Sequence, residues 1–263
     1  MGKSLLPTDI TSARNRIIYY LRKYPGVVIS GNELLVVSGI QDYPRRIREL
    51  RVQFGWSIAS GVTMKEMQEA EDSEIPDDYR NMKPDEYILL ITEQDRDAAH
   101  RWNAANTIRR QKKSVQSKVL EFLRANVGRG VTGEELRYVA NNKTEWARRT
   151  RELRTEQGWP VATKSTGRPD LPVGVYVLQA DRQSHEHDLH IPDEVRRAVL
   201  RRDRYTCQVC GWTHDLWNPS DPRHLELHHL EHHAKGGDNS EENLQAMCNS
   251  CHDVRHRDEK DQE

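Results

Sequence analysis

The feature that most constrains the fold is an internal repeat in the first two thirds of the chain. The segment RRIRELR at residues 45–51 returns as RRTRELR at residues 148–154, an offset of 103. Two further blocks match in the same order: Gly-Trp at 55–56 and 158–159, and Ser/Thr-Gly-x-Glu-Leu at 30–34 and 132–136. Three matched blocks in one order indicate a duplicated domain with a one-residue insertion.

Each copy predicts the same order of elements, namely three helices and then two strands. Apolar periodicity predicts the first helix, and a Ser or Thr cap begins the second. The third helix of copy one has Pro44 in its first turn, a position that proline prefers. The expected helices are 14–24 and 31–37 in copy one, and 117–126 and 133–140 in copy two; the expected strands are 56–60, 86–92, 159–164 and 174–178.

This layout resembles the winged helix-turn-helix superfamily, in which the third helix enters the major groove of DNA. An apolar stripe on that helix, at positions 43, 47, 50 and 54, is expected in the core. The candidate DNA-binding residues on the opposite face are Arg45, Arg48, Arg148 and Arg151. Arginine can bind guanine through two hydrogen bonds. The competing interpretation is that 45–49 and 148–152 are Arg–Glu surface ion pairs one helical turn apart.

Charge is divided unevenly along the chain, although the net charge is only −1. Residues 106–180 carry 15 Lys and Arg against 7 Asp and Glu, whereas residues 181–263 carry 11 against 18 and hold 11 of the 12 histidines. A basic domain attracts phosphates whatever the total charge is. Copy two is therefore the expected DNA reader, while an acidic insert at 66–78 leaves dimerisation or sensing open for copy one.

Four cysteines occur in the chain, and all lie in its last part as two Cys-x-x-Cys pairs: Cys207, Cys210, Cys248 and Cys251. This spacing is typical of zinc binding in an intracellular protein. Four thiolates close a tetrahedral site, so the zinc would be structural rather than catalytic. The pairs alone would fit a non-catalytic zinc ribbon equally well.

The stretch 225–256, LELHHLEHHAKGGDNSEENLQAMCNSCHDVRH, carries further motifs. A strand ends in His-His at 228–229, Gly-Gly follows at 236–237, Asn-Leu at 243–244, and Cys-x-x-Cys-His at 248–252. The order resembles the His-Asn-His (ββα-metal) nuclease family. The sequence departs from that pattern where many relatives have proline, since His232 and His233 stand there.

The resemblance implies roles for individual residues. His229 would be the general base, with His228 and His252 as ligands of one catalytic Mg²⁺ or Mn²⁺. Asn243 would hold the loop and orient the base, and in some relatives it binds the metal. His256 is a further candidate ligand, because residues four apart share a helix face. His214 and His224 are expected at the surface. Cleavage would leave 5′-phosphate and 3′-hydroxyl ends.

The sequence therefore predicts an α+β chain with two winged-helix domains, each of three helices and a β-hairpin, and a zinc-stabilised ββα-metal nuclease domain. The expected bounds are 1–105, 106–180, a linker at 181–190, and 191–263. We expect a cytoplasmic restriction-type endonuclease acting on double-stranded DNA, without membrane contact. One active site per chain predicts a homodimer or sequential nicking. Three alternatives remain: a nuclease dependent on methylated DNA, a homing endonuclease, and a non-catalytic DNA-binding regulator.

Overall fold

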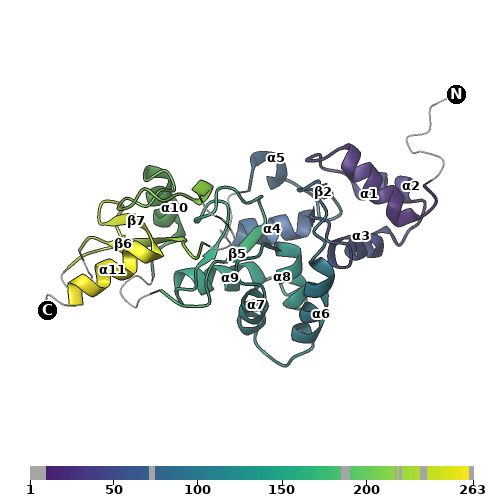
Figure 1. Cartoon of the computed structure of the whole chain (residues 1–263). Coiled ribbons are helices and arrows are strands. Elements are labelled where there is room, and N and C mark those ends of the chain that lie inside the picture. Colours follow the sequence, from purple (N-terminus) through teal and green to yellow (C-terminus); the bar gives the residue numbers. More distant parts are fainter. Residues whose placement is uncertain are drawn as a thin grey trace. The chain divides into compact units, whose positions relative to one another are not determined.

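The computed structural model describes residues 10–70, 75–184, 190–216, 218, 221–231 and 236–260. Two compact units make up the chain, and Figure 1 follows their elements from purple to yellow. The first unit comprises Met1–Phe122, Thr132–Ala147 and Pro172–Gly174; the second comprises Leu123–Val131, Arg148–Leu171 and Val175–Glu263. None of the helices in the described ranges combines the length and the apolar character needed to cross a membrane.

Three helices form the core of copy one in the first unit: α1 (Ala13–Lys23), α2 (Gly31–Ser38) and α3 (Tyr43–Val52). They pack through Ile17, Leu34 and Ile47, each 0 % exposed. Ser12 and Ser30 cap the first two helices by accepting backbone N–H groups, as short hydroxyl side chains do at helix N-termini. The antiparallel pair β1 (Ile58–Ser60) and β2 (Tyr87–Leu89) completes the copy.

The acidic insert between β1 and β2 contains two helices, α4 (Gly61–Glu69) and α5 (Asp77–Arg80). Helix α4 packs against α8 (Gly133–Val139) of copy two. Its Glu66 is only 7 % exposed and accepts hydrogen bonds from Trp146 Nε1 at 2.7 Å and Arg137 Nε at 2.8 Å. Part of the predicted insert is thus a packed helix whose acidic side chain is neutralised from within the unit.

Helix α6 (Ala98–Arg109) has no counterpart among the elements expected from the sequence. Its Arg101 is 6 % exposed and donates to Glu135 at 2.9 Å and to Asp95 at 2.5 Å. The helix contacts α8 and α3. Its apolar residues do not gather on one face, which removes the periodicity on which helix prediction depends.

Copy two repeats the element order of copy one and adds a short strand. It consists of α7 (Val115–Arg124), β3 (Val131–Thr132), α8, α9 (Trp146–Thr155), β4 (Val161–Ala162) and β5 (Val175–Leu178). The sheet has the order β3-β5-β4. Thr132 and Glu135 form a reciprocal capping box at the start of α8. The boundary between the two units runs through this copy.

The second unit ends in a ββα arrangement. Helix α10 (Asp193–Arg202) begins after Pro192, and a 3-10 turn, η2, covers His214–Leu216. Strands β6 (Leu225–His229) and β7 (Leu244–Cys248) pair antiparallel, with Leu225 opposite Cys248, and lead into α11 (Asn249–Lys260). The buried residues include Val199, Trp212, Leu227, Leu244 and Ala246.

Candidate active site

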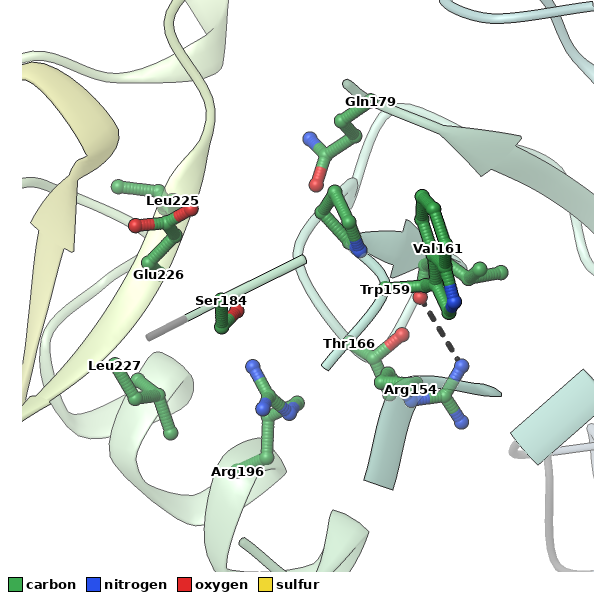
Figure 2. Close-up of a pocket in the computed structure, with 11 residues that line it drawn as sticks. Arg154, Trp159, Val161, Thr166, Gln179, Ser184, Arg196, Leu225, Glu226 and Leu227 are labelled. Atoms are coloured by element: carbon green, nitrogen blue, oxygen red, sulfur yellow. Dashed lines mark hydrogen bonds between the residues drawn. The ribbon is translucent and has the colours of Figure 1, made fainter. Parts of the chain in front are cut away.

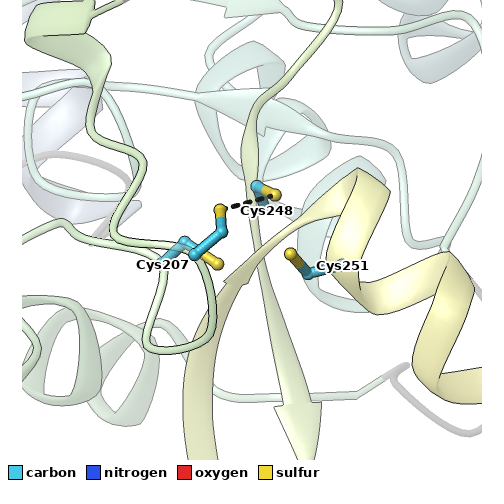
Figure 3. A group of neighbouring side chains, drawn as sticks. Cys207, Cys248 and Cys251 are labelled. Carbon is cyan, nitrogen blue, oxygen red and sulfur yellow. Dashed lines mark hydrogen bonds between the residues drawn. The ribbon is translucent and has the colours of Figure 1, made fainter.

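The four cysteines converge in the second unit. Cys207 and Cys210 lie in the turn after α10, Cys248 ends β7, and Cys251 lies in the first turn of α11 (Figure 3). Their sulfur atoms lie within 4.8 Å of one another, and Cys210 Sγ is 3.8 Å from Cys248 Sγ. Ligands about 2.3 Å from a tetrahedral zinc are about 3.8 Å apart. The group therefore fits zinc.

Ionisation of all four thiols would require a cation close to them. Burial opposes ionisation of Cys207, but backbone N–H groups, including those of Cys210 and Cys248, lower its pKa to about 7. Burial and the nearby Cys207 raise the pKa of Cys248 to about 11, and burial also raises that of Cys251. One ionised thiolate thus opposes ionisation of the next thiol, and a bound divalent cation would offset this repulsion between negative charges.

A second group of ligand atoms comes from three histidines on β6 and α11. The ring nitrogens of His228, His252 and His256 lie within 4.8 Å of one another, and the residues are 0, 0 and 7 % exposed. The two Nε2 atoms of His252 and His256 are 3.0 Å apart. Neighbouring ligands about 2.1 Å from an octahedral ion are about 3.0 Å apart. The geometry therefore fits a metal ion.

Glu226 supports this cluster from the same face of β6 as His228, because alternate strand residues share a face. It accepts a hydrogen bond from His252 Nδ1 at 2.6 Å and one from His224 Nε2 at 3.0 Å. Burial alone would raise the pKa of Glu226, but these two hydrogen bonds lower it far below its usual range. An ionised Glu226 keeps the proton of His252 on Nδ1 and leaves Nε2 for the metal.

The expectation that His224 lies at the surface is wrong, because it is 1 % exposed and bonded to Glu226. His214 is also largely covered, with a side chain 7 % exposed and 3.6 Å from Asp170. Burial lowers the pKa of His214, and Arg168 lowers it further. His232 and His233 lie outside the described residues. Strand alternation in 224–228 was the signal that could have found His224 and Glu226.

His229 is the last residue of β6 and is 0 % exposed. Its Nε2 forms a hydrogen bond of 2.8 Å with Oδ1 of Asn239. The other amide atom of Asn239, Nδ2, donates to the carbonyl oxygen of His190 at 3.2 Å. Nothing in the spacing of Asn239 from His229 in the sequence predicts this contact.

Asn243 clamps the connection between β6 and β7. Its Oδ1 accepts from Glu231 N–H at 2.8 Å, while Nδ2 donates to Glu231 O at 2.9 Å and Asp238 O at 2.8 Å. Gly237 lies against the same backbone, where a Cβ would stand only 1.8 Å from Glu231 O. The expected loop-holding contacts of Asn243 are therefore present, whereas the side chain in contact with His229 Nε2 is that of Asn239.

The four candidate DNA-binding arginines lie on α3 and α9. Arg45 is 3.3 Å from Glu49, and Arg148 is 2.9 Å from Glu152, with arginine side chains 58 and 65 % exposed. The i,i+4 ion pairs of the competing interpretation are therefore formed. Arg48 is exposed and Arg151 is half-buried. The partner carboxylates are only 15 and 6 % exposed, but each is also paired with a second arginine, Arg46 or Arg149, and keeps it if a phosphate binds Arg45 or Arg148.

A pocket near Glu226 is too small for a substrate (Figure 2). Its volume is about 20 Å³, and Arg154, Arg196 and Ser184 contribute polar groups to its wall. This space is sufficient for a water molecule and little more.

Two family models match the chain. The model described as the KpnI N-terminal domain matches residues 14–90 and 116–179, more than half of the chain, and each matched segment contains one copy of the repeat. The model described as HNH endonuclease matches residues 207–258, which include the cysteine group and all three clustered histidines. No curated protein and no solved structure matches the chain.

Proposed function

Because the chain belongs to the family of the KpnI N-terminal domain and ends in an HNH endonuclease domain, we propose that it is a sequence-directed, restriction-type endonuclease of double-stranded DNA. The observation that carries this proposal is the buried triad His228, His252 and His256, backed by the carboxylate of Glu226. Such a cluster offers three imidazole rings to a metal, and a further histidine, His229, follows His228 on the same strand.

The repeated part would direct the nuclease to its target. We assign 1–105 and 106–180 to two winged-helix readers, 181–190 to a linker, and 191–263 to the nuclease domain. Three helices followed by paired strands in each copy support this assignment. The basic excess of 106–180 and the exposure of Arg148 favour copy two as the main DNA contact.

His228, His252 and His256 would hold one divalent ion. Such an ion supplies positive charge for the phosphate and leaving oxygen during hydrolysis. Imidazole ligands suit transition ions, whereas Mg²⁺ prefers oxygen ligands and dehydrates reluctantly. Of the two ions expected from the sequence, Mn²⁺ therefore fits this donor set better.

His229 would take the proton from the attacking water, since imidazole titrates near neutral pH. Asn243 keeps the backbone around Glu231 and Asp238 in place next to this base through three hydrogen bonds. Cys207, Cys210, Cys248 and Cys251 would bind a structural zinc. This zinc would join the turn after α10 to β7 and α11, the elements that carry the other ligands.

The test is incubation of the purified protein with methylated and unmethylated plasmid in Mg²⁺ or Mn²⁺. We expect discrete fragments from the wild type and from the exposed-histidine control His100→Ala. His229→Ala should lose activity by roughly 10²- to 10⁴-fold. DNA binding without cleavage by the wild type would contradict the nuclease and favour a regulator.

The same assay separates the methylation-dependent alternative, which predicts cleavage of methylated plasmid alone. Trp146 begins α9, the third helix of copy two, but it is 0 % exposed and bonded to Glu66. Its burial argues for a core role and against base reading. Within the described residues the chain has one three-histidine cluster, which supports a homodimer or sequential nicking for cutting both strands.

A further inference from the structure

The amide of Asn239 can be oriented from its two neighbours. A backbone carbonyl only accepts hydrogen bonds, so the atom that faces His190 O at 3.2 Å must be the NH₂ group. The amide oxygen is then the atom 2.8 Å from His229 Nε2. An amide oxygen also only accepts, and Nε2 of His229 must therefore carry a proton.

From this geometry we propose that Asn239 is a positioning residue for His229, which fixes the plane of its ring and keeps a proton on Nε2. The proposal rests on the proposed function, in which His229 is the general base. A base that occupies one orientation and one tautomer does not have to reorganise before each proton transfer. Asn239 would thus serve His229 as a carboxylate or amide serves the histidine of a catalytic triad.

Asn239 is itself held on both sides. On one side, Asn243 Nδ2 donates to the carbonyl of Asp238, the residue before Asn239. On the other, the acceptor of its NH₂ group is the backbone of His190, whose own N–H donates to Thr155 O at 2.9 Å. Thr155 is the last residue of α9. The amide therefore lies between two backbone anchors rather than on a mobile side chain.

The backbone at His190 is unusual, with φ +64° in a residue that is not glycine. Positive φ is uncommon outside glycine, although His, like Asn and Asp, adopts it more often than other residues do. The next residues are secured, because Ile191 is 1 % exposed and Asp193 is bonded to Arg154. His190 is thus fixed from both directions in a left-handed conformation, and this places its carbonyl where it accepts from Asn239.

The experiment compares Asn239→Ala, Asn239→Asp and the loop control Ser240→Ala with wild type and His229→Ala in steady-state cleavage assays in Mn²⁺. We expect Asn239→Ala to lower kcat roughly 10- to 100-fold with little change in KM, as for outer partners of functional histidines. Asn239→Asp keeps an acceptor for Nε2 and should recover most of this loss. Ser240→Ala should cleave like wild type.

A nitrogen-15 NMR spectrum of the histidine rings supplies a readout that does not depend on cleavage. His229 is assigned by the signals lost in His229→Gln. We expect a protonated Nε2 in wild type and a tautomer mixture in Asn239→Ala. Metal analysis should find the same amounts of bound Mn²⁺ and zinc in Asn239→Ala as in wild type. This result would show that the variant loses the positioning of His229 and not the metal sites.

The outcomes distinguish two failures. Absence of cleavage by wild type would refute the proposed function, while the NMR spectrum would still test the contact. Cleavage by Asn239→Ala within about twofold of wild type, with His229→Ala inactive, would refute the positioning role. Two other results would show that positioning does not depend on the hydrogen bond. One is an unprotonated His229 Nε2 in wild type, and the other is an equal kcat for Asn239→Asp and Asn239→Ala.

Discussion

Arg154 at the end of α9 and Asp193 at the start of α10 form a buried two-point ion pair. Nε donates to Oδ1 at 2.8 Å and Nη2 donates to Oδ2, with side chains 3 and 6 % exposed. Arg51, the equivalent residue of copy one, lies 3.1 Å from Glu134 at the start of α8. In both copies this arginine also donates to the backbone of the following strand, at Ile58 or Val161. The repeat thus uses one arginine position for the same kind of contact twice.

Asp193→Asn should destabilise the protein by about 3–5 kcal/mol, because it leaves the buried charge of Arg154 without its partner. Chemical denaturation measures the loss. Asp181→Asn is the matched control, since Asp181 and Arg124 form an ion pair with side chains 42 and 52 % exposed. The control should change stability far less, because solvent screens this exposed pair. Equal losses in the two variants would contradict the importance of burial.

The Asp193 pair also predicts a pH dependence of stability. Burial raises the pKa of Asp193, but Arg154 lowers it more, and the folded value lies below the usual one. The ionised carboxylate therefore stabilises the fold fully above the unfolded pKa of about 3.9, and this contribution is lost as the pH falls through the folded pKa. The stability difference between wild type and Asp193→Asn should be constant at neutral pH and shrink in acid. A constant difference throughout would exclude this linkage.

Removal of zinc should unfold the C-terminal ββα part. Cys248→Ser is expected to lower the bound zinc, measured by metal analysis, and to abolish the cooperative unfolding of this part. Because thiols must lose protons to bind zinc, and the pKa of Cys248 is raised to about 11, zinc should be released as the pH falls. His228→Ala should retain zinc, since its ligand group is separate from the cysteines. Loss of zinc in that variant would show that the two sites are not independent.

Glu226→Gln should weaken Mn²⁺ binding by about 10- to 100-fold, the effect of losing the partner of a metal-binding histidine. In the wild type the Glu226 carboxylate accepts a hydrogen bond from His252 Nδ1 at 2.6 Å and so favours the proton on that atom. An uncharged amide at this position favours it less. Titration of Mn²⁺ by calorimetry measures the change, with exposed Glu242→Gln as control. Unchanged affinity in Glu226→Gln would mean that His252 is oriented by other groups.

Arg148→Ala and Arg151→Ala should each weaken DNA binding and reduce the slope of log K against log salt by about one, if each contacts a phosphate. Arg45→Ala, the copy-one counterpart of Arg148, should have a smaller effect because copy two carries the basic excess. Fluorescence anisotropy at several salt concentrations measures all three. Equal effects of Arg45→Ala and Arg148→Ala would mean that both copies of the repeat contact DNA.

The sequence alone determined the features that depend on short spacings. Three patterns predicted ligand groups: the two Cys-x-x-Cys pairs, the His228-His229 strand end, and the i,i+4 spacing of His252 and His256. In the structure the four cysteines lie together, and so do His228, His252 and His256. The repeat predicted the three helices and paired strands of each copy. Such patterns are readable because a turn, a strand face or a helix face fixes the relative positions of residues close in sequence.

Only the tertiary structure decided which distant side chains meet. Glu66 on the acidic insert is buried against Trp146, 80 residues away, and Arg154 finds Asp193, 39 residues away. The contact of Asn239 with His229 likewise depends on how Asn243 folds the loop between β6 and β7. None of these pairs has a periodic signature, because the path of the chain between the two residues, and not a local repeat, decides which side chains meet.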